Sequence, residues 1–169
     1  MSGLSVTTDP SSEPLTSAET ISYLRLDSGV DTTLIGNLIK AARVWTENYL
    51  NRTLINTVYK LSLDGIDEMD MPLKEGIYTA PYNISYINYI ELPRSPVSAV
   101  SSVKYFSDDN TESTWATSNY YVDTVREPAR IVLRDGGSWP TDLRNANGIE
   151  VNYTAGYGTN TTDVPEAIR

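Results

Sequence analysis

The pattern of apolar residues changes near Arg52, and this change limits the folds that the chain can adopt. Between Asp31 and Asn51, apolar residues recur at every third or fourth position, as in an amphipathic helix that buries one face. After Arg52 the chain breaks into short segments rich in β-branched and aromatic residues, some of which alternate apolar with polar positions, as strands do. Because the helical pattern comes first and the strands follow, the sequence predicts an α+β fold with segregated elements.

The N-terminal part predicts a pair of helices. Thr16 and Glu19 have the spacing of a capping box, in which each side chain satisfies a free backbone N–H, and a short helix should follow to about Leu26. Asp31 is a good cap for a longer helix, which should end near Asn51 because asparagine tolerates the left-handed conformation of helix ends. We interpret the apolar stripe of this longer helix as core rather than interface. Its members are Leu34, Ile35, Leu38, Ile39, Ala42, Trp45 and Tyr49.

The central part predicts an antiparallel β meander or a small barrel. Segments rich in aspartate, asparagine and glycine separate the candidate strands, as turns do. The strands are expected over residues 57–63, 85–92, 97–106, 120–123, 130–133 and 149–154.

The two ends of the chain differ in character. Pro165 and Glu166 are typical of the first turn of a helix, so a C-terminal helix is expected to begin at the chain end, and we expect a further portion after Arg169. The sequence thus predicts effectively one domain. Its parts are a flexible polar arm at 1–14, a helical part at 15–53, a β-rich part at 54–158 with an insert at 74–89, and the start of a C-terminal helix or tail at 159–169.

The composition argues against several classes of function. The chain has 169 residues and neither histidine nor cysteine, so it lacks the usual general base, the usual nucleophilic thiol and the usual zinc ligands. We therefore expect that it is not an enzyme and binds no cofactor or metal. A net charge of −9 opposes binding to nucleic-acid phosphates. No apolar run approaches the roughly 20 residues of a membrane-spanning helix.

Several short motifs follow one another in a recognisable order between Leu15 and Arg169. They are Leu15-Thr16 at a helix start, Leu24-Arg25-Leu26, Tyr49-Leu50-Asn51-Arg52-Thr53-Leu54, Leu92-Pro93-Arg94-Ser95-Pro96-Val97, Pro128-Ala129-Arg130-Ile131, Gly137-Ser138-Trp139-Pro140, Val151-Asn152-Tyr153-Thr154-Ala155-Gly156-Tyr157-Gly158 and Val164-Pro165-Glu166-Ala167-Ile168-Arg169. Each motif alone could occur in an unrelated protein. As an ordered set they resemble the head-to-tail connector (adaptor) family of tailed bacteriophages.

This resemblance implies a structural virion protein of the neck, the head–tail junction, made in the host cytoplasm. It implies a homo-oligomer, a dodecameric ring beneath the portal protein that joins the capsid to the next neck or tail-completion protein. DNA would pass through its channel without sequence-specific binding, and no membrane would be involved. The chain departs from the family pattern in two places: the insert at 74–89 has no family counterpart, and family members continue past the final Ala-Ile-Arg as a long apolar helix.

The candidate interface residues are mostly tyrosines. The chain has 12 tyrosines and one phenylalanine, and tyrosine combines a large apolar face with a hydroxyl that tolerates water. The predicted interface residues are Tyr78, Tyr82, Tyr86, Tyr89 and Arg169. An ordinary half-exposed strand face and a carbohydrate-stacking surface are the alternatives for the tyrosines. Tyr49 and Tyr59 are expected at the edge of the core, whereas Tyr153 and Tyr157 are expected to pack.

An acidic segment follows the first predicted strand. Its candidate residues are Asp64, Asp67, Glu68 and Asp70. Their spacing is only loosely that of a calcium loop, so we interpret them as a solvated loop or as a negative rim facing a channel. Arg94, Arg126, Arg130 and Arg134 lie in or beside predicted strands, where ion pairing is a better expectation than contact with DNA.

Two other functional classes remain open from the residues alone. One is a β-rich tail or receptor-binding module in which the tyrosine-rich insert recognises carbohydrate. The other is a glycosidase that uses a pair of carboxylates, although no spacing in the chain selects such a pair.

Overall fold

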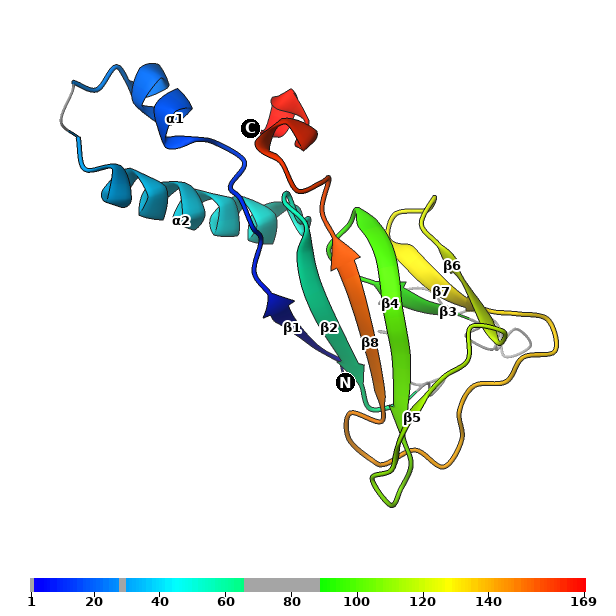
Figure 1. Cartoon of the computed structure of the whole chain (residues 1–169). Helices are drawn as coiled ribbons and strands as arrows, with labels where there is room; N and C mark the ends of the chain where they lie inside the picture. The colour runs from blue at the N-terminus through cyan, green and yellow to red at the C-terminus, as the bar shows by residue number, and fades with distance from the viewer. Residues whose placement is uncertain (1, 28–29, 66–88) are drawn as a thin grey trace, which may run out of the picture.

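The computed structural model describes residues 2–27, 30–65 and 89–169 (Figure 1). The described chain contains the helices α1 (Ser17–Leu24) and α2 (Thr32–Leu50) and two short 3₁₀ helices (Thr161–Asp163 and Glu166–Ile168). Its strands are β1 (Ser2–Thr8), β2 (Thr57–Leu63), β3 (Tyr89–Leu92), β4 (Val97–Phe106), β5 (Glu112–Thr114), β6 (Tyr120–Asp123), β7 (Ala129–Leu133) and β8 (Ile149–Ala155). The class is therefore α+β, as expected.

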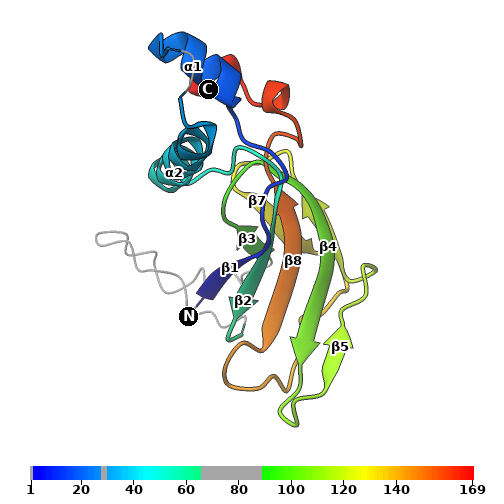
Figure 2. The ribbon, with the colours of Figure 1, turned by 60° about the vertical axis from the view of Figure 1, so that its left-hand side comes forward.

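The strands form two antiparallel sheets that share one core. The five-stranded sheet has the order β1-β2-β8-β4-β5, and the three-stranded sheet has the order β3-β7-β6. Figure 2 shows the smaller sheet behind β2, β8 and β4. Buried side chains from both sheets form a single hydrophobic cluster, to which β8 contributes Ile149, Val151, Tyr153 and Ala155.

This arrangement corrects the prediction of a meander or small barrel. Strand β8, from the end of the chain, lies between β2 and β4 and pairs with both, so neighbours in the larger sheet are not neighbours in sequence. The described strands do not close into a barrel. The four core-face residues of β8, Ile149, Val151, Tyr153 and Ala155, are at most 1% exposed, and flanking strands on both sides of β8 give this degree of burial.

The first residues also differ from their prediction. The sequence predicts a flexible arm over 1–14, whereas Ser2–Thr8 forms the edge strand β1, antiparallel to β2. Backbone pairing holds this strand, because every side chain from Gly3 to Asp9 is exposed. A segment with so little apolar burial gives no clear sequence signal for a strand.

The predicted helix caps are confirmed. Thr16 and Glu19 form the capping box of α1. The Asp31 carboxylate accepts the backbone N–H groups of Thr33 and Leu34 at 2.9 and 3.1 Å, and Asn51 ends α2 in the left-handed conformation with φ 51°. None of the helices in the described ranges is long and apolar enough to cross a membrane.

The prediction that the whole apolar stripe of α2 is core is wrong. Only Ile35 and Ile39 of the predicted set are buried, and the other two buried positions of α2 are the charged residues Arg43 and Glu47. The physical reason is the position of the helix: α1, α2 and the C-terminal 3₁₀ turns lie at one end of the two sheets, and most of α2 projects beyond them (Figure 1). Tyr49, expected at the core edge, is exposed, whereas Tyr59 is buried as predicted.

The end of the described chain forms 3₁₀ turns where a C-terminal helix was expected to start. Val164 is buried with Leu54 and Ile55 in a small second core. Beyond it, the Ile168 N–H donates to Pro165 O in a single 3₁₀ turn. Anchoring at Val164 therefore directs the chain back onto the helical end of the molecule.

Candidate assembly surface

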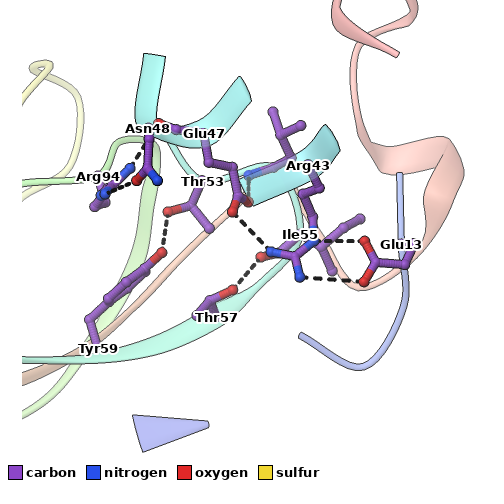
Figure 3. A network of polar contacts seen from close by, with 10 residues as sticks. Glu13, Arg43, Glu47, Asn48, Thr53, Ile55, Thr57, Tyr59 and Arg94 are labelled. Carbon is purple, nitrogen blue, oxygen red and sulfur yellow. Dashed lines mark hydrogen bonds and ion pairs between the residues drawn. The ribbon is translucent and has the colours of Figure 1, made fainter. Parts of the chain in front are cut away.

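A buried ion-pair network joins α2 to the sheets and to the N-terminal segment (Figure 3). Arg43 Nε donates to Glu13 Oε2 at 2.7 Å, and Arg43 Nη1 donates to Glu47 Oε2 at 2.9 Å. The other oxygen of Glu47 accepts the backbone N–H of Leu54 at 2.8 Å. Arginine and glutamate at i and i+4 on one helix face thus replace an apolar pair at the point where α2 enters the β-rich part.

Arg94, from the loop after β3, also contacts the junction between α2 and the sheets. Arg94 Nη1 donates to the backbone carbonyl of Glu47 at 2.8 Å, and its Nη2 donates to Asn48 Oδ1 at 2.6 Å. The hydroxyls of Thr53 and Tyr59 lie 2.9 Å apart in a buried hydrogen bond. These contacts fix the direction in which α2 leaves the sheets, because they hold both its last turn and the connection that follows it.

The charges of the junction compensate one another. Burial by itself lowers the pKa of Arg43, but the carboxylates of Glu13 and Glu47 outweigh burial and keep the pKa above its usual range. Arg43 therefore stays charged while buried, and it is hydrogen-bonded to both carboxylates.

The two ends of the described chain meet beside this junction. Ser12 Oγ donates to Thr159 O at 2.7 Å, and Thr161 Oγ1 donates to Glu13 O at 3.1 Å. Arg169 Nε donates to Pro14 O at 3.1 Å, and its Nη2 contacts Glu19 Oε1 at 2.6 Å. The predicted interface residue Arg169 is thus engaged within its own chain, and its role in an interface stays a prediction.

An exposed apolar stripe runs along α2 on the side away from the sheets. We call Leu34, Leu38, Trp45 and Tyr49 the α2 stripe. Trp45 and Tyr49 are 68% and 76% exposed, and their rings stack with centroids 5.5 Å apart. The charged residues of α2 lie elsewhere: Arg43 and Glu47 are on the buried face, and Lys40, at about 100° per residue, lies on the opposite side from the stripe.

An apolar groove adjoins the α2 stripe. It lies between α1, α2 and the C-terminal turns, has a volume of about 340 Å³, and is lined by Pro14, Leu24, Ile35, Leu38 and Ile168 among others. Tyr23 and Leu24 of α1 are exposed beside it. The stripe and the groove form a continuous uncovered apolar area, which in a monomeric protein marks a site of interaction.

Sequence reasoning missed this surface although one signal was present. Ile35, Ile39, Arg43 and Glu47 share a line at i+4 spacing and include an opposite-charge pair. That line, rather than the longer apolar stripe, is the buried one. Because apolar residues cover more of the helix than one buried face needs, the surplus indicated a second contact surface.

Of the four tyrosines of the predicted interface, the described residues include Tyr89. Tyr78, Tyr82 and Tyr86 lie outside the described residues. Tyr89 is half-buried at the start of β3, and the guanidinium carbons of Arg126 and Arg130 lie 6.0 and 5.5 Å from its ring centre. Tyr153 and Tyr157 pack as predicted, the first fully buried and the second against the small core.

The acidic candidates are described only in part. Asp67, Glu68 and Asp70 lie outside the described residues. Asp64 Oδ1 accepts the backbone N–H of Asn147 at 3.0 Å, and this bond holds the pKa of the Asp64 carboxyl below its usual range. Within the described ranges, no group of three or more acidic residues could hold a metal ion.

The four arginines contact their own chain. Arg130 pairs with Asp123 at 2.9 Å and Arg126 with Glu91 at 3.6 Å, as the ion-pairing prediction states. Arg94 and Arg134 instead donate to backbone carbonyls, those of Glu47 and Tyr120. Arg94 thereby stabilises the last turn of α2, and Arg134 stabilises the start of β6.

Comparisons with known proteins give a structural likeness only. No protein-family model matches the chain, and a search of curated sequences finds no significant match. Solved structures do match over 96% of this chain. A chain from the virion of a native gene transfer agent (GTA) particle has a TM-score of 0.71 at 18% identity, with 75% of its own length covered. A chain from the neck of an empty GTA particle, computed with C6 symmetry, has a TM-score of 0.70 at 21% identity and 75% coverage. A chain from the neck of a native GTA particle, computed with C12 symmetry, has a TM-score of 0.63 at 20% identity and 74% coverage.

Proposed function

We propose that this chain is a non-enzymatic structural protein of the neck of a phage-like particle. The observation that carries the proposal is the fold: the likeness to chains of GTA virions and necks extends over 96% of this chain with TM-scores up to 0.71. The ordered sequence motifs, which resemble those of the connectors of tailed phages, support the same role.

In this proposal, identical copies form a ring, dodecameric by analogy with the neck computed with C12 symmetry. A cyclic ring uses two different patches of each subunit, so every copy needs apolar surface beyond its own core. The α2 stripe and the adjoining groove are surface of this kind, because both are largely apolar and neither is covered in the single chain. The charged residues that line the groove, Arg43 and Arg169, are paired with glutamates of their own chain.

The ring would lie between the portal protein and the next neck or tail-completion protein, and DNA would pass through it. The net charge of −9 supports this role, since a duct that repels phosphates does not retain the DNA that moves through it. No cofactor takes part. The protein would be made in the host cytoplasm and end in the virion.

The test is imaging of the protein alone and with its particle. Mass photometry and negative-stain images of purified protein, with and without portal protein, should show closed rings. Antibody or gold labelling of intact particles should place the chain at the neck. A location on the capsid surface or tail tip, or a copy number too small to close a ring, would contradict the proposal.

A further inference from the structure

The edge strand β1 is held almost entirely by backbone pairing. Its residues pair with β2 from Ser2 opposite Leu63 to Thr8 opposite Val58. Among the described side chains of β1, two add hydroxyl bonds: Ser5 Oγ donates to Lys60 O at 3.4 Å and Thr7 Oγ1 donates to Val58 O at 3.1 Å. The backbone bonds and these hydroxyl bonds of β1 all go to the edge of β2, and any copy of the chain has the same edge.

The apolar side chains of β1 lie on the core face of the sheet but are only partly covered. Leu4 lies opposite Leu61 and Val6 opposite Tyr59, and directly opposite residues share a face. Leu61 and Tyr59 are buried, whereas Leu4 and Val6 are 38% and 51% exposed. The apolar side chains of β1 therefore extend the core face of the sheet beyond the buried cluster.

The anchor of the N-terminal segment is separate from β1. Glu13 is bound by Arg43, Pro14 is buried, and Ser12 is bonded to Thr159 O. Between this anchor and β1 lie only residues 9–11, for which the structure gives no side-chain hydrogen bond. At about 3.3 Å per extended residue, the segment from Ser2 to Ser11 can reach roughly 30 Å from the anchor without disturbing it.

We propose that β1 is an exchange strand: in the assembled ring, β1 of each copy leaves its own β2 and pairs with β2 of the next copy. This inference rests on the ring of the proposed function. The backbone bonds that are broken are re-formed with an identical edge, so the exchange needs little net energy, as in domain swapping. In a closed ring every vacated β2 edge receives a neighbour's strand, so no β2 edge stays open.

Charge favours a second copy as the partner. Each copy carries a net charge of −9, so like-charge repulsion opposes most contacts between copies. Ser2–Thr8 contains no charged residue, and it is therefore a segment that one acidic chain can place on another without that repulsion. Leu4 and Val6 would then lie opposite Leu61 and Tyr59 of the next copy.

Disulfide trapping tests the exchange directly, because the chain has no cysteine. Ser5 and Lys60 are directly opposite each other, and the double variant Ser5→Cys/Lys60→Cys is oxidised after ring assembly. We expect a ladder of covalent multimers on non-reducing gels, which collapses on reduction. Exclusively intrachain disulfides in the assembled sample would overturn the proposal.

The matched control places one cysteine at the same β2 position. Lys60 lies opposite Asn152 of β8 on its other side, so Lys60→Cys/Asn152→Cys should give only intrachain disulfides in every state. Mass spectrometry of mixed ¹⁵N-labelled and unlabelled chains should find hybrid linked peptides for the first pair and none for the second. Circular dichroism of the reduced variants checks that both are folded.

Two measurements on the same samples test the strand exchange and the formation of rings separately. Mass photometry of the same samples reports whether rings form. Rings with intrachain disulfides would reject the strand exchange and leave the proposed function standing. Absence of rings together with intrachain disulfides would reject both.

Discussion

Arg43 is the residue on which the junction between helix and sheets depends most. Its side chain is 6% exposed and is shared between Glu13 and Glu47, and Glu47 in turn holds the backbone N–H of Leu54. Removing the arginine leaves the buried Glu47 carboxylate and the partly buried Glu13 carboxylate without a counter-charge. The desolvation of such groups is more costly than the loss of the ion pair itself.

We therefore expect Arg43→Met to lower the free energy of unfolding by about 3 kcal/mol, measured by urea denaturation. The matched control is Arg126→Met, because Arg126 and Glu91 are about half exposed and 3.6 Å apart. A surface pair of this kind contributes about 0–1 kcal/mol. Equal losses in the two variants would show that the buried network has no special role.

A second prediction at this scale concerns Gly156, in the bend after β8. Its φ is +137°, and a Cβ there would lie 2.5 Å from the backbone nitrogen of Asn56. We expect Gly156→Ala to lower the free energy of unfolding by about 3 kcal/mol or more, through backbone strain and overlap. Gly36 in α2 has open space around the same position, so Gly36→Ala should raise stability by about 0.5–1 kcal/mol. Thermal unfolding of both variants measures these opposite changes in stability.

At the scale of elements, the short helix α1 depends on its first turn. It has 8 residues and buries none of them, and helices of this length are marginal without help. The Glu19 carboxylate accepts hydrogen bonds from the Thr16 N–H and hydroxyl at 2.8 Å each. It also contacts Arg169, so the capping box links α1 to the C-terminal turn.

This linkage predicts how α1 responds to acid. Bonds from Thr16, and then from Arg169, lower the pKa of Glu19. Because the folded pKa lies below the unfolded value of about 4.3, the stabilisation is present above that value and is lost as the pH falls through the folded pKa. NMR titration should show Glu19 titrating below its usual range, with faster amide exchange in α1 at lower pH. In Thr16→Ala the Glu19 pKa should rise; no change in that variant would contradict the assigned cause.

At the scale of the whole molecule, the sheets bury their own core and the helical end does not. The two sheets share one hydrophobic cluster, whereas α2 leaves Trp45 and Tyr49 largely in water. A single chain gains nothing from this exposure. In the proposed ring, the same surface would be covered by another subunit.

We expect Trp45→Asp to change the free energy of unfolding of the monomer by about 1 kcal/mol or less, since surface changes are small, and to abolish ring formation. Lys40→Asp, which places a carboxylate on the other side of the same helix, should leave rings intact. Mass photometry and urea denaturation measure the two effects separately. Rings that form normally with Trp45→Asp would exclude the α2 stripe from the interface.

The sequence by itself determined the local elements. The caps at Thr16, Asp31 and Asn51 follow from hydrogen bonds within a few residues, and β2, β4 and β6 have the predicted bounds. Such features depend on neighbours in the chain, which a sequence displays directly. Of the predicted interface and acidic residues, only Tyr89, Asp64 and Arg169 are described, and each contacts its own chain.

The tertiary structure alone decided which strands are neighbours, which face of α2 is buried, and that residues 2–8 form a strand. The order β1-β2-β8-β4-β5 joins segments far apart in the chain, and alternation shows that a strand has a buried face without naming its partner. On α2, apolar residues cover more than one face, so only the placement of the helix at the end of the sheets selected Ile35 and Ile39 for burial. Strand β1 is held by the backbone of β2, and backbone groups are the same at every position, so no side-chain pattern could predict it.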